Sequence, residues 1–304
     1  DTNQVKSADA VTYDNNGDVI PLSERFNNKN EDIRYSDRDS EGNVLSAEQQ
    51  AYFKDSKVRD ENGSLMVVYH GTVREFYTFD KSYANPEGNM GSGFYFTSDS
   101  YDVERNYANV DGADLTNKIE QEAEFLENEE EYEGMEHEEI VEMLREKYIT
   151  AEEPITLETY LKIQNPCYVG KNETYLMSDV SDEYDIEDYD DEDDYYADVE
   201  QMAQSYIDDI MSAIENENFY NTDEIPSVLY EAFSDGGITL ENLKEKLNEL
   251  YIEDENGKLV SNEVARIIVE QLGYDGIIDS TVSTKFKNMG MNQGTIHYIV
   301  FDSN

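Results

Sequence analysis

Short apolar runs and longer helical patterns divide the chain into a strand-rich frame and a helical middle. Runs such as Leu65-Met66-Val67-Val68-Tyr69 are rich in β-branched and aromatic residues, which favours buried strands. Apolar positions spaced three and four apart, with polar residues between them, predict amphipathic helices. The pattern predicts strands over residues 65–69, 94–97, 157–163, 276–279 and 295–301, and helices over residues 46–53, 101–108, 199–214, 240–250, 261–272 and within 115–148.

Capping residues support several of these boundaries. Ser46 and Thr239 stand where helix N-caps are expected, and Gly273 stands at a helix C-cap. Because strands flank a helical middle, the predicted fold class is α+β in one domain. Its sheet would take pieces from residues 65–112, 155–170 and 273–304.

The charge of the chain is extreme and unevenly placed. The formal net charge is −49 at pH 7. Residues 119–260 hold 44 acidic and 7 basic residues, so this stretch alone carries −37. Nucleic-acid binding needs Lys and Arg to neutralise phosphates, so direct binding to DNA or RNA is not expected. Residues 182–194 hold ten acidic residues in thirteen and predict a solvated or disordered loop.

Cysteine usage and hydropathy bear on location. Cys167 is the single cysteine, so no intrachain disulfide is expected, which favours a reducing compartment. No run approaches the ~18 apolar residues that cross a bilayer, and we expect no signal peptide in the polar residues 1–4. The sequence therefore predicts a cytoplasmic chain with no membrane partner.

His137 has no second His within ligand spacing, so we expect no metal and a solvated helix face there.

Residues that could take part in catalysis or ligand binding occur in three motifs. His70 ends the first predicted strand after Tyr69 and is followed by Gly71 and Thr72, although a His at a strand end is alone more often structural than functional. The segment Gly91-Ser92-Gly93-Phe94-Tyr95-Phe96-Thr97 places Tyr95 25 residues after His70, and Tyr107 follows twelve residues later. The last predicted strand contains Ile296-His297-Tyr298-Ile299-Val300-Phe301-Asp302.

In order and spacing, these motifs resemble the ADP-ribosyltransferases of the His-Tyr-Glu class, which include the catalytic domain of poly-ADP-ribose polymerases. The chain looks closer still to the ADP-ribosyltransferase-like domains of polyvalent proteins from phages and conjugative elements. The resemblance covers residues 61–112, 155–170 and 270–304. It implies a split β-sheet fold, with the acidic helices as an insertion at about residues 113–260.

The resemblance also implies a reaction and a site. ADP-ribose would pass from NAD, used as a substrate, to an acceptor. Tyr95 and Tyr107 would sandwich the flat nicotinamide ring, and the backbone of Gly71 would bond its carboxamide because a side chain there would block the approach. His70 would hydrogen-bond a ribose hydroxyl. The other implied NAD-binding residues are Thr72, Gly93, Phe96 and Thr97. The two threonines among them would support the pocket wall.

One residue departs from the family pattern. The Glu of the final strand, which stabilises the cationic transition state, falls by register on His297. We expect His297 to be catalytic together with His70 and Tyr95, and Asp275 or Asp302 could stand in for the missing acid. Elongation to a polymer is not expected, whereas transfer of one ADP-ribose to a host protein in a bacterial cytoplasm is. Two alternatives stay open: an acidic mimic of nucleic acid that inhibits a DNA- or RNA-handling enzyme, and an inactive NAD-binding domain.

The first residues resemble a continuation of the last. In the resembling domains the final strand leads into Gln-Ile/Val-Lys-Ser, and residues 4–7 are Gln-Val-Lys-Ser. We therefore expect residues 1–45 to be a linker or the tail of a preceding repeat unit. Residues 46–304 would form the ADP-ribosyltransferase-like domain.

Overall fold

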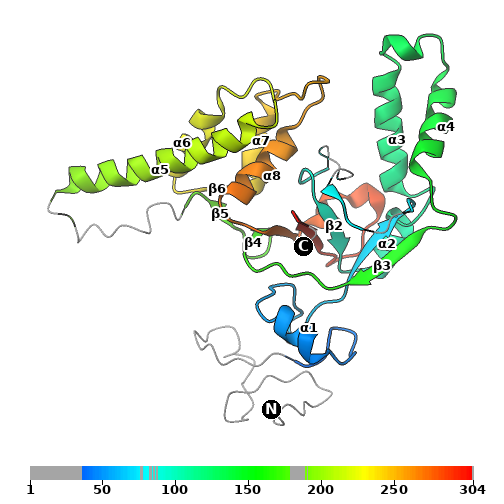
Figure 1. Ribbon diagram of the computed structural model, residues 1–304, viewed down its shortest axis with the longest axis horizontal. Helices are drawn as coiled ribbons and strands as arrows, with labels where there is room; N and C mark the ends of the chain where they lie inside the picture. Colours follow the sequence, from blue (N-terminus) through cyan, green and yellow to red (C-terminus); the bar gives the residue numbers. More distant parts are fainter. Residues whose placement is uncertain are drawn as a thin grey trace. The chain divides into compact units, whose positions relative to one another are not determined.

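The computed structural model describes residues 36–75, 78–81, 84, 86, 88–178, 189 and 191–302 (Figure 1). Helices and strands occur together in them, so the predicted α+β class is confirmed. The chain forms two compact units. Unit 1 comprises Asp1–Tyr77, Phe96–Gln164 and Val282–Ile296, and unit 2 comprises Thr78–Tyr95, Asn165–Thr281 and His297–Asn304.

Unit 1 contains an antiparallel sheet with β1 between β3 and β2. β1 pairs with β3 along its whole length, as far as Thr72↔Ile155, and with β2 at Tyr69↔Thr97. The pairing with β3 explains why β1 runs on to Thr72, whereas the sequence predicted a strand over residues 65–69. The strands are β1 (Val68–Thr72), β2 (Phe94–Thr97, whose first two residues belong to unit 2) and β3 (Ile155–Thr159).

Two helices of unit 1, α3 and α4, form a hairpin (Figure 1). Its core consists of Leu115, Ile119, Ala123, Ile140, Leu144, Tyr148 and Val73. The predicted helical stretch 115–148 is therefore two helices separated by a 3-10 turn. The helical elements of unit 1 are α1 (Ala47–Tyr52), α2 (Ser100–Asn106), α3 (Ala113–Leu126), η2 (Glu130–Tyr132), α4 (His137–Tyr148), α9 (Val282–Lys285) and η4 (Lys287–Met289).

The segment that leads into α1 is tied to unit 1 by a buried acid. Asp39 accepts hydrogen bonds from the backbone N–H groups of Glu41 and Asn43 at 2.9 and 2.8 Å, and from the Tyr160 hydroxyl at 2.7 Å. Residues 1–35 of the predicted linker lie outside the described residues, whereas residues 36–45 are anchored. Ser46 caps α1 as the sequence predicted, in a capping box with Gln49.

Unit 2 contains the strands β8, β7 and β4 in that order. β7 (Gly276–Asp279) pairs antiparallel with β8 (His297–Val300) and parallel with β4 (Pro166–Val169). The sequence predicted a turn at Asn165-Pro166, but Pro166 opens β4, a position where a proline is tolerated because the first residue need not donate. A two-stranded sheet joins β5 (Tyr175–Leu176) to β6 (Ile238–Thr239).

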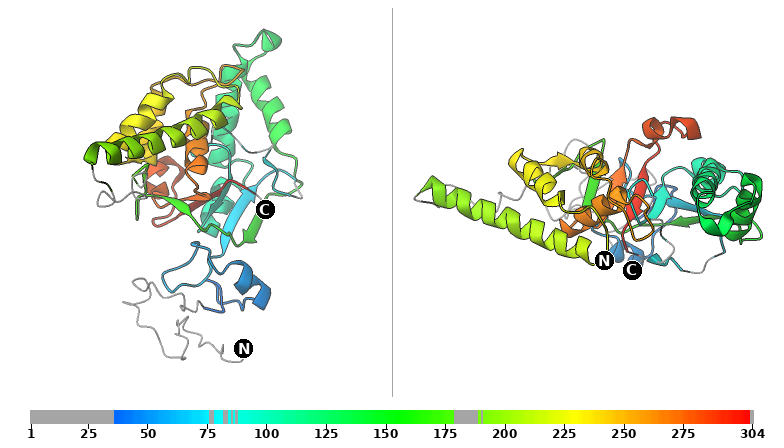
Figure 2. Two further views of the ribbon diagram at one scale, coloured as in Figure 1. Left: turned by 60° about the vertical axis from the view of Figure 1, so that its left-hand side comes forward. Right: turned by 90° about the horizontal axis from the view of Figure 1, so that it is seen from above.

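Four helices of unit 2 pack together as the α5–α8 bundle. The helices α6, α7 and α8 lie beside the C-terminal part of α5, whose N-terminal part projects beyond them (Figures 1 and 2). α6 was not among the predicted helices. Of the acidic run 182–194, residues 182–188 and 190 lie outside the described residues, and the last three form the first turn of α5. The helices are α5 (Glu192–Glu215), α6 (Ile225–Ser234), α7 (Leu240–Asn248) and α8 (Ser261–Gln271).

In the part of the chain that the structure describes, no helix has both the length and the apolar character needed to cross a membrane.

Candidate functional site

The predicted site residues fall into two groups, one in each unit. Unit 1 holds His70, Gly71, Thr72, Phe96, Thr97 and Tyr107, and unit 2 holds Gly93, Tyr95 and His297.

In unit 1, the pairing of β1 with β2 brings His70 to Phe96. Tyr69 opposes Thr97, so the next residue on β1 opposes the preceding residue on β2, and both point to one face of the sheet. The ring centroids of His70 and Phe96 lie 5.5 Å apart at an interplanar angle of 51°. Phe96 and Thr97 are buried, whereas His70 is half-buried. The imidazole is therefore supported by a buried ring while part of its surface stays accessible.

Gly71 lies directly against the end of α2. A Cβ atom at this position would lie 2.7 Å from Val103 Cγ1, 2.8 Å from Ala108 N and 2.8 Å from Tyr107 Cβ. Any side chain would collide, so the glycine permits the close approach of Tyr107 to the β1 backbone. This differs from the sequence argument, which required a glycine to admit the ligand. Tyr107 is the C-cap of α2 and donates its N–H to Val103 O at 2.9 Å, so the predicted helix 101–108 ends earlier.

Thr72 ends β1, and its hydroxyl accepts a hydrogen bond from Arg74 N at 3.0 Å. That hydroxyl holds the turn after the strand. The predicted role of Thr72 and Thr97 in a pocket wall stays a prediction.

A buried acid that the sequence did not single out fixes α2. Asp102 is fully buried and accepts hydrogen bonds from Asn292 N at 3.0 Å and Thr295 Oγ1 at 2.5 Å. Arg105 of the same helix donates to Met289 O at 2.5 Å. The segment before β8 is therefore tied to the helix that carries Tyr107. In the sequence, Asp102 looks like any acid in the first turn of a helix.

In unit 2, the hydroxyl of Tyr95 is used by the turn that precedes it. It donates to Gly91 O at 2.7 Å and accepts from Met90 N at 3.0 Å. Gly91 has a positive φ of 71°, and a Cβ at Gly93 would lie 2.5 Å from Ile299 Cγ2. The two glycines therefore let this turn pack closely against α8 and β8, and the Tyr95 hydroxyl is taken up by the turn itself.

A buried ion pair of α8 supports the same turn. Glu263 accepts from Ser92 N and pairs with Arg266 Nη2 at 2.8 Å, and both residues are less than a tenth exposed. Burial alone would lower the pKa of Arg266, but Glu263 and Glu270 raise it above its usual value. Arg266 therefore stays charged. Its guanidinium also lies 5.7 Å from the ring centroid of Phe301.

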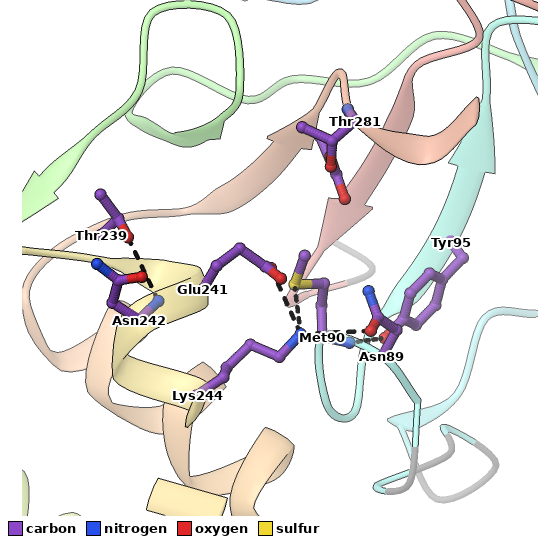
Figure 3. A network of polar contacts seen from close by, with 9 residues as sticks. Asn89, Met90, Tyr95, Thr239, Glu241, Asn242, Lys244 and Thr281 are labelled. Atoms are coloured by element: carbon purple, nitrogen blue, oxygen red, sulfur yellow. Dashed lines mark hydrogen bonds and ion pairs between the residues drawn. The ribbon is translucent and has the colours of Figure 1, made fainter. Parts of the chain in front are cut away.

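A buried lysine from α7 reaches the other side of this turn (Figure 3). Lys244 Nζ lies 3.3 Å from Asn89 Oδ1, 3.9 Å from Met90 Sδ and 3.5 Å from Glu241 Oε1. The side chain is only 8% exposed, so its charge is compensated by these partners rather than by water. Charged residues of two helices thus fix the turn that leads into Tyr95. The sequence motif did not predict this, because Lys244 and Glu263 lie about 150 residues or more after it.

His297 opens β8 and is buried, with Asp279 as its Cα partner on β7. Asp275 and Asp302 stand at the opposite end of this strand pair, where Gly276 opposes Val300. Three residues of a strand span about 10 Å. Neither acid is therefore placed to stand in for a carboxylate at His297.

His137, predicted as part of a solvated helix face, pairs with two glutamates of the α3–α4 hairpin. Its Nε2 lies 3.0 Å from Glu120 Oε2 and its Nδ1 lies 2.5 Å from Glu127 Oε1. Hydrogen bonding to Glu127 and then to Glu120 raises the pKa of His137. Over the described ranges, no group of three or more His, Cys, Asp or Glu side chains could hold a metal ion.

Comparison with known proteins adds one match. A family model described as "ADP-Ribosyltransferase in polyvalent proteins" matches residues 60–304. No curated protein and no solved structure matches the chain. The match covers most of both units, including every residue of the candidate site.

Proposed function

Because the chain belongs to the family of ADP-ribosyltransferases in polyvalent proteins, we propose that it transfers a single ADP-ribose from NAD to a protein of a bacterial host. The observation that supports the site assignment most directly is the contact of Gly71 with Tyr107, beside the half-buried His70. A backbone strand next to an aromatic side chain offers the two features that a nicotinamide ring needs: a flat surface for stacking and peptide groups for its carboxamide.

In the proposed reaction, the bond between nicotinamide and the anomeric carbon breaks, and its electron pair goes to the nicotinamide nitrogen. A lone pair of the acceptor forms the new bond to that carbon, and a hydroxyl or amine acceptor releases its proton to a base or to water. The transition state has oxocarbenium character and is stabilised by nearby negative charge. His70 would position a ribose hydroxyl, and Tyr107 would stack on the departing ring.

The proposal of single transfer rather than polymer synthesis rests on His297. The position that carries a Glu in the resembling enzymes holds an imidazole here. The cytoplasm is the proposed location, since the substrate NAD and the host acceptor are both expected there.

Incubation with NAD labelled in its adenine part, with and without bacterial lysate, tests the proposal. We expect label on host protein and release of nicotinamide. Tyr107→Ala and His70→Ala should each lower release by about 100- to 1,000-fold, the effect expected for a group that stabilises the transition state. Tyr101→Ala is a matched control, because Tyr101 lies on the same helix and is 57% exposed. Equal loss in all three variants, or no turnover by the folded wild type, would refute the assignment.

One observation favours a second function. α5 extends beyond the helices that it packs against and contains acidic residues but no Lys or Arg (Figure 2). A rod of negative charge can imitate nucleic acid toward a basic partner. Inhibition by mimicry would be supported if the protein captures a DNA- or RNA-handling enzyme in a salt-sensitive way that Tyr107→Ala does not affect. An inactive NAD-binding domain would be supported if the folded protein binds NAD without turnover.

A further inference from the structure

A buried carboxylate faces His297 across the strand pair of unit 2. Asp279 on β7 is the Cα partner of His297 on β8, in an antiparallel pair. Directly opposed residues of such a pair point to the same face, with Cβ atoms about 4.5–5.5 Å apart. Asp279 is 2% exposed and His297 is 8% exposed. An acid and an imidazole thus share one buried face at the end of the sheet.

The turn after β7 holds this carboxylate in place. One oxygen, Oδ1, accepts hydrogen bonds from Thr281 N at 2.7 Å and Thr281 Oγ1 at 2.6 Å. The same turn is fixed to β4, because Ser280 N donates to Val169 O at 3.0 Å. A Cβ at Gly170 would lie 2.5 Å from Thr281 Cγ2, so the chain packs closely there. The acid is therefore oriented before any ligand arrives.

Burying a carboxylate is expensive unless hydrogen bonds or a partner compensate for lost hydration. The partner most directly opposed to Asp279 is the residue at which this chain lacks the expected acid. An imidazole that donates one ring N–H to a carboxylate presents its other nitrogen in a defined tautomer and orientation. Such a pair can bind a hydroxyl and also bring negative charge near it.

Resting on the proposed function, we propose that Asp279 is a positioning residue for His297. It orients the imidazole toward a ribose hydroxyl of the dinucleotide substrate, and the Asp279–His297 pair replaces the single carboxylate of the resembling enzymes. Thr281 sets the orientation of Asp279. Asp275 and Asp302 have no such part, because they lie at the other end of the strands.

A double-mutant cycle on nicotinamide release separates this role from a merely structural one. Asp279→Asn should lower kcat about 10- to 100-fold, the loss typical when a carboxylate that orients a metal-ligating histidine is removed. In the His297→Glu background, which restores a carboxylate on β8, the same substitution should cost little or should increase kcat by removing a second negative charge. A structural role for Asp279 would give the same loss in both backgrounds and would overturn the proposal.

Imidazole ¹⁵N NMR gives a readout that does not depend on turnover. The chain has three His residues, so the His297 signals can be assigned with His70→Gln and His137→Gln. Asp279→Asn should change the ¹⁵N shifts and tautomer of His297 and leave His137 unchanged. Thr281→Val should cause a smaller change of the same kind and serves if Asp279→Asn does not fold. Asp302→Asn is the matched control.

The two failures are distinguishable. Wild-type protein that folds, shows the His297–Asp279 coupling and still releases no nicotinamide would refute the proposed function alone. Wild-type turnover combined with unchanged His297 resonances in Asp279→Asn would refute the positioning role alone.

Discussion

The α3–α4 hairpin and the α5–α8 bundle carry the same kind of sequence but are integrated differently. The hairpin and helices α5, α6 and α7 lie in the acidic stretch at about residues 113–260, which the sequence treated as one insertion, and α8 follows it directly. The buried residues of the hairpin come from α3, α4 and Val73. The core of the bundle also includes residues of β4, β7 and β8, among them Cys167, Ile277 and Ile299. The bundle is therefore part of the core of unit 2, whereas the hairpin has a core of its own.

The net charge of a helix therefore says little about whether that helix is an accessory. Acidic side chains on solvated faces leave the apolar stripe free to build a core. In the bundle, two charged residues also have a structural use: Lys244 and Glu263 hold the turn before Tyr95. A helix predicted as an insertion thus supports a motif of the candidate site.

Cavities in the two cores should lower stability the most. Leu229 on α6 and Leu144 on α4 are both fully buried. Replacing either by Ala should lower the free energy of unfolding of its own region by about 3–5 kcal/mol, through lost burial and the cavity left behind. Only Leu229→Ala should expose Cys167, because only the bundle shares its core with β4. The measurement is the rate at which a thiol reagent labels Cys167 under native conditions.

Leu144→Ala is the matched control for this comparison. Its hairpin amides should exchange faster with deuterium while Cys167 stays protected. Equal labelling of Cys167 in both variants would mean that the two regions unfold together, and the distinction drawn between them would be wrong.

A smaller effect is expected from the buried ion pair. Glu263→Ala removes the acceptor for Ser92 N and one of the two partners of Arg266, so the free energy of unfolding of unit 2 should fall by about 2–3 kcal/mol. Chemical denaturation measures this. Lys246→Ala breaks a solvent-exposed pair with Glu231 and should leave the midpoint unchanged. Similar losses in both variants would show that the buried pair of Glu263 contributes no more to the free energy of unfolding than the exposed pair of Lys246.

Local patterns in the sequence predicted most elements of the frame. The strands at 94–97 and 276–279, the cap at Ser46 and the cap at Thr239 are confirmed, because each depends on neighbouring residues. The start of β4 at Pro166 and the continuation of β1 beyond His70 to Thr72 were missed. Both depend on pairing with strands far away in sequence, which a local pattern does not contain.

The residues of the candidate site also divide into those that a local pattern singled out and those that it did not. The motifs around His70, Tyr95 and Tyr107 were recognisable because their spacing is short and regular. Asp279 and Glu263 were not, since a single acid in an apolar strand or in a helical i, i+3 pair has no distinctive spacing. Their roles appear only once the register of β7 with β8 and the packing of α8 are known.

The contribution of Cys167 to the pH dependence of unit 2 should be confined to alkaline solution. Burial raises the pKa of Cys167 from 9.0 to about 12. The folded state therefore keeps the thiol proton above pH 9 while the unfolded state loses it, so stability should fall as pH rises from about 9 to 12. Between these two values the expected slope is about 1.4 kcal/mol per pH unit. Cys167→Val should flatten this part of the curve, and an identical slope in the variant would exclude the thiol as its cause.

The smallest effect belongs to the α3–α4 hairpin and falls in a different pH window. Glu127, and then Glu120, raise the pKa of His137 above its usual 6.5. The stabilisation by this pair is complete below the pKa of the unfolded chain and is lost as pH rises through the higher folded value, near and above neutrality. The protection factors of amides in the first turn of α4, which correct for the intrinsic rise of exchange with pH, should therefore fall over that range in the wild type and not in His137→Gln, while those of β7 stay constant. Because His137 is exposed, added salt should weaken the effect. If amide protection in β7 also falls as the pH rises through neutrality, the hairpin and unit 2 are energetically coupled, contrary to their separate cores.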